Sequence, residues 1–360
     1  MEDLDRNFDG DGHWLDHLYL RLKSKDTLFS KGWGDEKLTK KIVNLESLTE
    51  KPRDLNIHFT KRVEEKRFTS LEATFKNPFI EFPLPKNSEQ GFLEFILPKG
   101  VDLFKKSSKP PLVLLMPASG DDTFTYRRRK LAIPLAQKGI ASVMLEIPFY
   151  GRRKPEAQEE TNIGLVSDFA LMLYMSYQEG RSILYSFFKN GFYNLGVSGF
   201  SMGGFFASGI ASSLPFPTAL VAALTGNTIA DTLVYGNCQQ SCQWSALIGN
   251  QSKIFAQKKL YNILDFIGNL EVLPLPPSLT TSLLINAQED AYIPPINAKK
   301  LKLLWKGVDQ IWIPGGHFTT IFKGAPIVVD ALELAFKSLK SPKKRDLGER
   351  PFRDLSSFSP

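Results

Sequence analysis

The chain contains few of the residues that build disulfide frameworks or metal sites. Its 360 residues include only two cysteines, Cys238 and Cys242, and four histidines. Two cysteines cannot provide the disulfide network that holds small secreted folds together, and no suitable ligand residues accompany them in sequence. We therefore expect reduced thiols, no bound metal and no cofactor.

Long apolar runs are also absent. No stretch reaches the roughly 18 consecutive apolar residues that a membrane-spanning helix needs, so the sequence predicts no such helix. The first residues, Met1 to Asp5, are acidic and lack the apolar region of a secretory signal. We therefore expect an intracellular protein, in a compartment that the sequence leaves open.

Basic residues exceed acidic ones, with 45 lysines and arginines against 38 aspartates and glutamates and a formal net charge of +7. No nucleic-acid-binding motif accompanies this excess, so we expect no nucleic-acid partner. The excess fits three interpretations: a solvated surface, an anionic substrate, or peripheral contact with an anionic membrane. The basic residues gather in three clusters, Arg127–Lys130, Arg152–Lys154 and Lys343–Arg345.

Apolar runs and helical stretches alternate from residue 67 to residue 340. Near-continuous apolar runs, such as residues 112–116 and 141–147, are typical of parallel strands buried on both faces. The alternation predicts an α/β domain with a mostly parallel sheet covered by helices on both faces. Residues 225–279 interrupt it, and two interpretations have equal weight: a lid-like insertion over the functional site, or an excursion packed on the core.

The two ends of the chain differ from this middle part. Residues 1–66 are polar with an amphipathic stretch, and we expect a helical extension packed on the main domain. Residues 5–16 partly match an EF-hand calcium loop, but Asp16 stands where that loop carries Glu, which favours a plain acidic turn. Residues 341–360 are charged and contain proline, which predicts a basic disordered tail.

A Gly-x-Ser-x-Gly motif at residues 199–203 directly follows an apolar run. Between a strand and a helix, this motif forms the nucleophile elbow of the α/β-hydrolase fold, where a sharp turn lifts the serine hydroxyl above the sheet. Small residues two positions before and after the serine permit the turn. Ser201 is therefore the candidate nucleophile, and it needs a base and an acid because a hydroxyl is a weak nucleophile at neutral pH.

Only one of the four histidines lies downstream of Ser201. His317 follows a short apolar segment and a glycine turn, the position after the last strand where this fold carries its base. Asp290, shortly after the apolar run at residues 282–287, is the candidate acid that orients the histidine, with Glu289 as the alternative. The chain order Ser, Asp, His is that of α/β hydrolases.

Acyl transfer also needs backbone N–H donors for the oxyanion of its tetrahedral intermediate. Met202, directly after the nucleophile, is expected to supply one donor. The second is expected from the loop of small residues after an early strand, where Ala118, Ser119 and Gly120 are the candidates.

An arginine triplet, Arg127, Arg128 and Arg129, follows the same loop within one helical turn. In one interpretation, one of these guanidinium groups faces the pocket and binds a phosphate or carboxylate of the substrate head group. In the other, the triplet is a solvated helix face, and this second interpretation is the favoured one.

Seven short segments of the chain carry a resemblance to a known family. They are Gly32–Gly34, Ser119–Asp121, Tyr126–Arg129, Phe149–Pro155, Gly199–Gly204, Gln288–Pro294 and Gly315–His317. Over roughly residues 28–340, the chain resembles the eukaryotic α/β-hydrolase-domain-containing protein 18 family, and the resemblance implies an eight-stranded hydrolase core with a serine-hydrolase triad. The chain lacks the long low-complexity insertion of animal members, so no function housed there is implied for it.

These residues predict a serine hydrolase that cleaves carboxylic esters through an acyl-enzyme on Ser201. Phe200, Phe205 and Phe206 around the nucleophile favour a lipid-like acyl chain. Two alternatives stay open: a binding or scaffold protein of the same fold without turnover, and an acyltransferase or thioesterase that uses the same triad. Ester, thioester and lipid substrates share one tetrahedral chemistry, so the sequence does not separate them.

Overall fold

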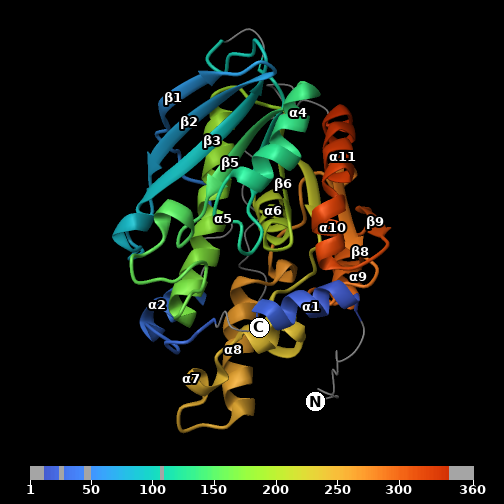
Figure 1. The fold of residues 1–360 in the computed structure, drawn as a ribbon. Helices are drawn as coiled ribbons and strands as arrows, with labels where there is room; N and C mark the ends of the chain where they lie inside the picture. Colours follow the sequence, from blue (N-terminus) through green and yellow to red (C-terminus); the bar gives the residue numbers. More distant parts are fainter. Residues whose placement is uncertain (1–11, 24–27, 44–49, 106–108, 340–360) are drawn as a thin grey trace.

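The computed structural model describes residues 12–23, 28–43, 50–105 and 109–339. Within these residues, one sheet of nine strands runs through the molecule in the order β1-β2-β3-β5-β4-β6-β7-β8-β9 (Figure 1). The pairs from β1 to β5 are antiparallel, and those from β5 to β9 are parallel. The strands are β1 (His58–Glu64), β2 (Phe68–Lys76), β3 (Gln90–Pro98), β4 (Leu112–Met116), β5 (Ala141–Glu146), β6 (Leu195–Phe200), β7 (Ala219–Ala223), β8 (Ser282–Ala287) and β9 (Asp309–Ile313).

The central strands are buried as their apolar sequences predict, whereas the edge strand β1 is not. β4, β5, β6 and β7 are buried along their whole length, as expected for parallel strands covered on both faces. The sheet has nine strands and not the eight expected, because β1 adds an edge strand within residues 1–66, which are therefore not purely helical. β1 is polar and mostly exposed, so it leaves little apolar signal in the sequence.

Helices cover both faces of the sheet. On one face, α11 (Ala325–Ser338) packs against α4 (Ile133–Gln137) and the π-helical turn Arg128–Ala132. On the other face, α5 (Val166–Lys189) packs against α6 (Met202–Ser212). Successive residues of β4 point alternately into these two cores. This arrangement is the α/β-hydrolase fold that the sequence predicts.

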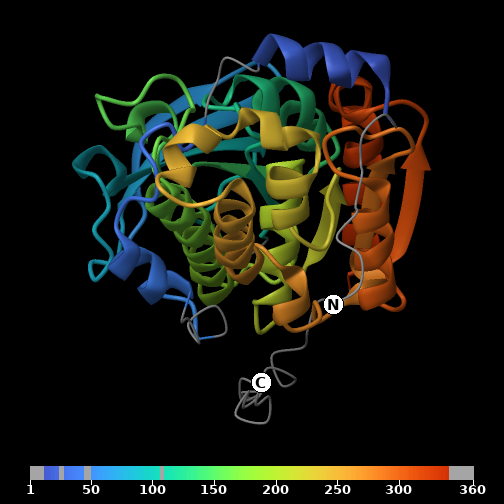
Figure 2. The same cartoon turned by 90° about the horizontal axis from the view of Figure 1, so that it is seen from below.

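Residues 225–279 connect β7 to β8 and contain α7 (Trp244–Ile248) and α8 (Lys253–Ile267). Both helices lie below the sheet in Figure 1, beyond the ends of the strands, and Figure 2 shows this end of the molecule from below. α8 buries Ala256, Leu260 and Leu264 in the core that also contains α5 and α6. This part of the insertion is therefore packed on the core, and its other part lines the pocket described below.

The N-terminal residues form α1 (Trp14–Lys23) and α2 (Glu36–Val43). α1 lies at the same end of the sheet as α8, beside α10 (His317–Lys323), whereas α2 packs against α5 and α8 (Figure 1). Residues 5–11 of the EF-hand-like segment and the tail at residues 341–360 lie outside the described residues. Among the described residues, no helix is long and apolar enough to cross a membrane. The remaining helices are α3 (Thr125–Arg127) and α9 (Pro295–Leu304), and short 3-10 or π turns complete the chain.

Candidate active site

Ser201 lies in the turn between β6 and α6. Its backbone angles, φ 55° and ψ −122°, belong to a region that residues with a side chain rarely adopt. Its N–H donates a hydrogen bond to the carbonyl of Ala223, so the turn is anchored to the neighbouring strand β7. This strained turn has the backbone geometry of a nucleophile elbow.

The glycines on either side of the nucleophile are required by close contacts at the elbow. A Cβ atom at Gly199 would lie 2.5 Å from the carbonyl carbon of Gly203. A Cβ atom at Gly203 would lie 2.5 Å from the carbonyl oxygen of Met116 at the end of β4. A side chain at either position would therefore push the strand and the helix apart and displace Ser201.

Ser201, His317 and Asp290 form a continuous chain of hydrogen bonds. Nε2 of His317 lies 2.9 Å from Oγ of Ser201, and Nδ1 lies 2.8 Å from Oδ2 of Asp290. His317 is 2% exposed and Asp290 is 4% exposed. When Nδ1 carries the proton and donates it to Asp290, Nε2 is left to accept the proton of the serine hydroxyl. The structure thus brings together the three residues that the sequence places far apart.

The backbone of its own loop holds the carboxylate of Asp290. Its Oδ1 accepts hydrogen bonds from the N–H groups of Tyr292 and Ile293, both at 2.8 Å, which leaves Oδ2 directed at His317. The Tyr292 ring stacks on the imidazole, with the ring centroids 4.9 Å apart. Glu289, the alternative acid, is exposed to solvent. Of the two candidate acids, Asp290 is therefore the one that contacts the histidine.

The oxyanion donors are expected where Met202 and the Ala118–Gly120 loop face the triad. Met202 is the first residue of α6, and a helix leaves its N-terminal N–H groups without an internal partner. Ala118, Ser119 and Gly120 line the same pocket as the triad. Burial raises the pKa of the Tyr150 phenol, which lines the pocket beside this loop. The second donor is therefore one of three candidate N–H groups, those of Ala118, Ser119 and Gly120.

A cavity of about 240 Å³ opens beside the triad. Among the described residues, its lining includes no Asp, Glu, Lys or Arg side chain. α1 contributes Leu20, and the insertion contributes Ile229, Leu233 and Cys238, so both segments form part of the wall. The other apolar and aromatic residues of the lining are Leu28, Ala118, Tyr150, Ile163, Phe169, Leu173, Met202, Phe205, Tyr292, Ile293, Phe318 and Ile321.

Arg127 lies at the wall of a second cavity, but its guanidinium bonds to protein acceptors. Its side chain is buried, Nε donates to Asp121 at 2.7 Å, and Nη1 donates to the carbonyls of Leu115 and Leu145 at 3.0 and 2.8 Å. Nη2 donates to the carbonyl of Thr123. Burial raises the pKa of Asp121, and the charge of Arg127 opposes that rise. This placement corrects the head-group hypothesis for Arg127, because its guanidinium ties the ends of β4 and β5 to the oxyanion loop.

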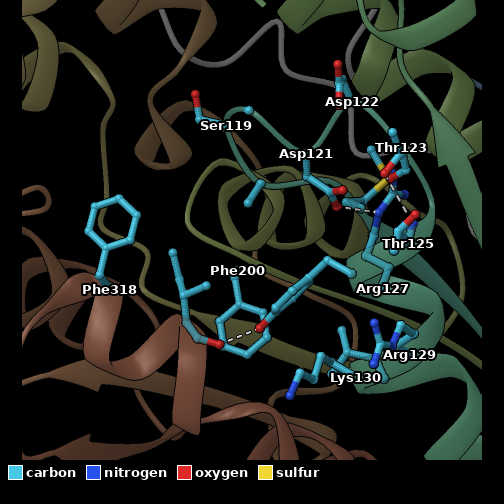
Figure 3. A pocket seen from close by; sticks show the side chains of 16 residues that line it. Ser119, Asp121, Asp122, Thr123, Thr125, Arg127, Arg129, Lys130, Phe200 and Phe318 are labelled. Atoms are coloured by element: carbon cyan, nitrogen blue, oxygen red, sulfur yellow. Dashed lines mark hydrogen bonds and ion pairs between the residues drawn. The ribbon is translucent and has the colours of Figure 1, made fainter. Parts of the chain in front are cut away.

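The other two arginines of the triplet are exposed. Arg128 forms an ion pair with Glu94 at 2.5 Å. Arg129 and Lys130 also line this second cavity, which has a volume of about 660 Å³ and adjoins the first at the Ala118–Gly120 loop. Figure 3 shows Arg127 turned toward Asp121, with Arg129 and Lys130 on the side of this cavity away from Ser119. Arg127 and Arg129 both line this cavity, but of the two only Arg129 is exposed.

Sequence reasoning missed three residues in or beside the site: Tyr150 lines the cavity, Tyr292 stacks on His317, and Asp16 bonds to the His317 backbone. Tyr150 and Tyr292 lie inside segments that the sequence singles out, but nothing in those segments says what either ring contacts. The carboxylate of Asp16 on α1 accepts a hydrogen bond from the His317 N–H at 2.7 Å. Its only sequence signal is the incomplete EF-hand pattern, which points to a different role.

Solved structures with a similar arrangement include two acetyl xylan esterases of low sequence identity. An acetyl xylan esterase from Paenibacillus sp. R4 matches with a TM-score of 0.55 and 14% identity, over 89% of this chain and 99% of that chain. Acetyl xylan esterase 1 from Thermoanaerobacterium sp. JW/SL YS485 matches with a TM-score of 0.47 and 12% identity, over 88% and 98%. At these identities the likeness establishes the fold alone, and only the first score is high enough to support even that.

A family model places the chain more narrowly. The model described as alpha/beta hydrolase domain containing 18 matches residues 26–265 and 255–337. These two spans cover most of the chain and include the elbow, the loop of Asp290 and His317. The chain therefore belongs to the alpha/beta hydrolase domain containing 18 family.

Proposed function

We propose that this chain is a serine hydrolase that cleaves carboxylic esters with an apolar, lipid-like acyl group through an acyl-enzyme on Ser201. The observation that carries the proposal is the buried hydrogen-bonded chain from Ser201 through His317 to Asp290, at 2.9 and 2.8 Å. Such a chain activates a hydroxyl for attack on an acyl carbon, and the apolar cavity beside it is suited to an acyl chain.

The reaction proceeds in two halves. Ser201 Oγ attacks the ester carbonyl while Nε2 of His317 takes its proton, and Asp290 stabilises the imidazolium that forms. The N–H groups of Met202 and the Ala118–Gly120 loop stabilise the oxyanion. His317 then gives the proton to the leaving alcohol oxygen. A water molecule, deprotonated by the same imidazole, attacks the acyl-enzyme. The bond between the acyl carbon and Ser201 Oγ then breaks, His317 returns the proton to Oγ, and the carboxylic acid leaves.

The cavity beside Ser201 defines the acyl part of the substrate. Its lining has no Asp, Glu, Lys or Arg side chain among the described residues, so a charged acyl group would be buried there without a partner. Its volume of about 240 Å³ lies below the roughly 300–1,000 Å³ typical of sites that enclose a whole drug-sized ligand. The cavity therefore suits one uncharged acyl chain, and the alcohol part of a lipid-like ester would lie outside it.

The adjoining cavity of about 660 Å³ is where the alcohol part would lie. Arg129 and Lys130 line it, together with Asp121 and Asp122. An anionic head group, or peripheral contact with an anionic membrane, would depend on Arg129 and Lys130 rather than on the buried Arg127. Esters that share one acyl chain and differ only in the charge of the alcohol test this part of the proposal.

Covalent capture tests the hydrolase proposal without knowledge of the substrate. A fluorophosphonate probe is expected to add one mass increment to the native chain, at Ser201, and to abolish ester hydrolysis. Ser201→Ala is expected to lose both labelling and hydrolysis, whereas Ser245→Ala, at an exposed serine of the insertion, is expected to retain both. Full labelling of the Ser201→Ala variant would mean that the nucleophile is another residue.

Three assays on the same preparation distinguish the alternative functions. A thioesterase would hydrolyse acyl thioesters faster than matched oxygen esters. An acyltransferase would pass the acyl group to an added alcohol in preference to water. A binding or scaffold protein would leave the probe unreacted, because its serine would not be activated.

A further inference from the structure

The side chain of Asp16, on the N-terminal helix α1, lies between the loop of Asp290 and the loop of His317. It is fully buried, at 0% exposure. Its Oδ2 accepts hydrogen bonds from the N–H groups of His317 at 2.7 Å and Ala291 at 3.1 Å, and its Oδ1 accepts one from Phe318 at 3.0 Å. One carboxylate therefore satisfies three backbone donors from two separate loops.

Those two loops are the ones that carry the acid and the base. Ala291 directly follows Asp290, and the other two donors are His317 itself and its neighbour Phe318. The residue before His317 is Gly316, which has no side chain to accept a hydrogen bond from the first turn of α10. The carboxylate of Asp16 supplies that acceptor from a position 301 residues earlier in the chain.

The surrounding contacts leave Asp16 little freedom. A Cβ atom at Gly316 would lie 2.4 Å from Oδ2 of Asp16, so only glycine allows this approach. The N–H of His13 donates to the carbonyl of Glu289 at 2.8 Å, which ties the start of α1 to the acid loop a second time. Tyr19, on the same helix, stacks on Phe318 with ring centroids 4.0 Å apart.

We infer that Asp16 is a positioning residue for the Ser201 hydrolase. It holds the loop of Asp290 and the loop of His317 at a fixed position relative to each other. This inference rests on the proposed function. The separation between Nδ1 of His317 and Oδ2 of Asp290 is set by two loops that follow different strands, β8 and β9. The bonds to Oδ2 join the two loops directly, since the N–H groups of Ala291 and His317 converge on the same oxygen atom.

The expected effect is on turnover and not on substrate affinity. Asp16 does not itself line the cavity beside Ser201, so its replacement removes no side chain from the acyl binding surface. A displacement of catalytic groups by about 1 Å can cost on the order of a hundredfold in rate. For Asp16→Ala we expect kcat to fall by roughly tenfold to a hundredfold, with KM unchanged within about twofold. Asp16→Asn keeps one carbonyl oxygen for the two bonds of Oδ2, so its loss is expected to be smaller.

The experiment measures kcat per active site on the full chain with an activated ester, the number of active sites being titrated with a fluorophosphonate. Leu18→Ala is the matched control, because Leu18 lies on the same helix and is 43% exposed. The inference is supported when the two Asp16 variants lose kcat per titrated site in the order Ala more than Asn, and Leu18→Ala does not. The rate of fluorophosphonate inactivation is expected to fall in the same order.

Two results would overturn the inference. One is a kcat per titrated site in Asp16→Ala equal to that of the native chain. The other is a loss of titratable sites alone, which would show that Asp16 stabilises the fold and does not position the catalytic groups. If Asp16→Ala does not fold, kcat per titrated site is compared between Asp16→Asn and the native chain, and an unchanged value overturns the inference. Persistence of hydrolysis in Ser201→Ala would instead refute the proposed function, so the two failures are distinguishable.

Discussion

Replacement of Asp290 by Asn should remove the base function of His317 while leaving its position intact. Two N–H groups, from Tyr292 and Ile293, donate to Oδ1 at 2.8 Å. In the asparagine variant, the carbonyl oxygen must take this place, because an NH2 group there would face two donors. The NH2 group then occupies the place of Oδ2 and faces Nδ1 of His317.

This orientation reverses the hydrogen bond to the histidine. An NH2 group donates to Nδ1, so Nδ1 must be the unprotonated nitrogen and Nε2 must carry the proton. Nε2 then cannot accept the proton of the Ser201 hydroxyl, 2.9 Å away. The corresponding change in another Ser-His-Asp triad costs about four orders of magnitude in kcat. We therefore expect kcat to fall by roughly 10³- to 10⁴-fold, with little change in thermal stability, because the three hydrogen bonds are kept.

The assay compares steady-state hydrolysis of an activated ester by the native chain, Asp290→Asn and Glu289→Gln. Glu289→Gln is the matched control: it removes the neighbouring carboxylate, which is exposed to solvent. This control is expected to keep kcat within about twofold of the native value. An Asp290→Asn variant that kept more than about a tenth of native kcat, or a large loss in Glu289→Gln, would refute the assignment of the orienting acid.

Three further predictions concern stability and specificity. Arg127→Met should lower the free energy of unfolding by about 3 kcal/mol in chemical denaturation, because it leaves the carboxylate of Asp121 buried without its partner; an unchanged midpoint would contradict this. Leu233→Trp, in the wall of the 240 Å³ cavity, should reduce kcat/KM for long-chain esters by at least about tenfold while sparing acetate esters; equal losses would mean that acyl chains lie elsewhere. The pKa of Glu333 is lowered to about 2, chiefly by the hydrogen bond from Lys138. Ionised Glu333 therefore stabilises the folded state above the unfolded pKa of 4.5, and this stabilisation is lost as the pH falls toward 2. The melting temperature of Glu333→Gln should therefore lie below the native value at pH 7 and converge with it in that window.

The sequence predicts the fold and the triad because their signals are local. Buried parallel strands require continuous apolar runs, and their alternation with helices predicts a mostly parallel sheet covered on both faces. The elbow needs small residues at Gly199 and Gly203 because backbone atoms would contact any side chain there. The scarcity of histidine then leaves His317 as the only downstream base.

Features that depend on distant contacts could not be predicted in the same way. The edge strand β1 has only two apolar residues, Phe59 and Val63, so the sequence contains no regular apolar pattern that predicts its pairing with β2. The arginine triplet has the composition of a solvated helix face. Arg127 is buried only because its guanidinium meets the carbonyls of Leu115 and Leu145, which belong to two different strands. The presence of an arginine in the sequence does not indicate which backbone carbonyls it will contact in the folded chain.

The same limit explains why the role of Asp16 needs the folded chain. The carboxyl ends of parallel strands meet at one edge of the sheet, so the loops after β8 and β9 lie side by side there and their backbone N–H groups need acceptors. A helix packed across that edge can supply an acceptor to both loops at once, and α1 does so with a single carboxylate. Helix α1 is thus connected by hydrogen bonds to the two loops that carry Asp290 and His317. A substitution in α1 that leaves the three residues of the triad unchanged is therefore expected to alter the rate at which Ser201 reacts.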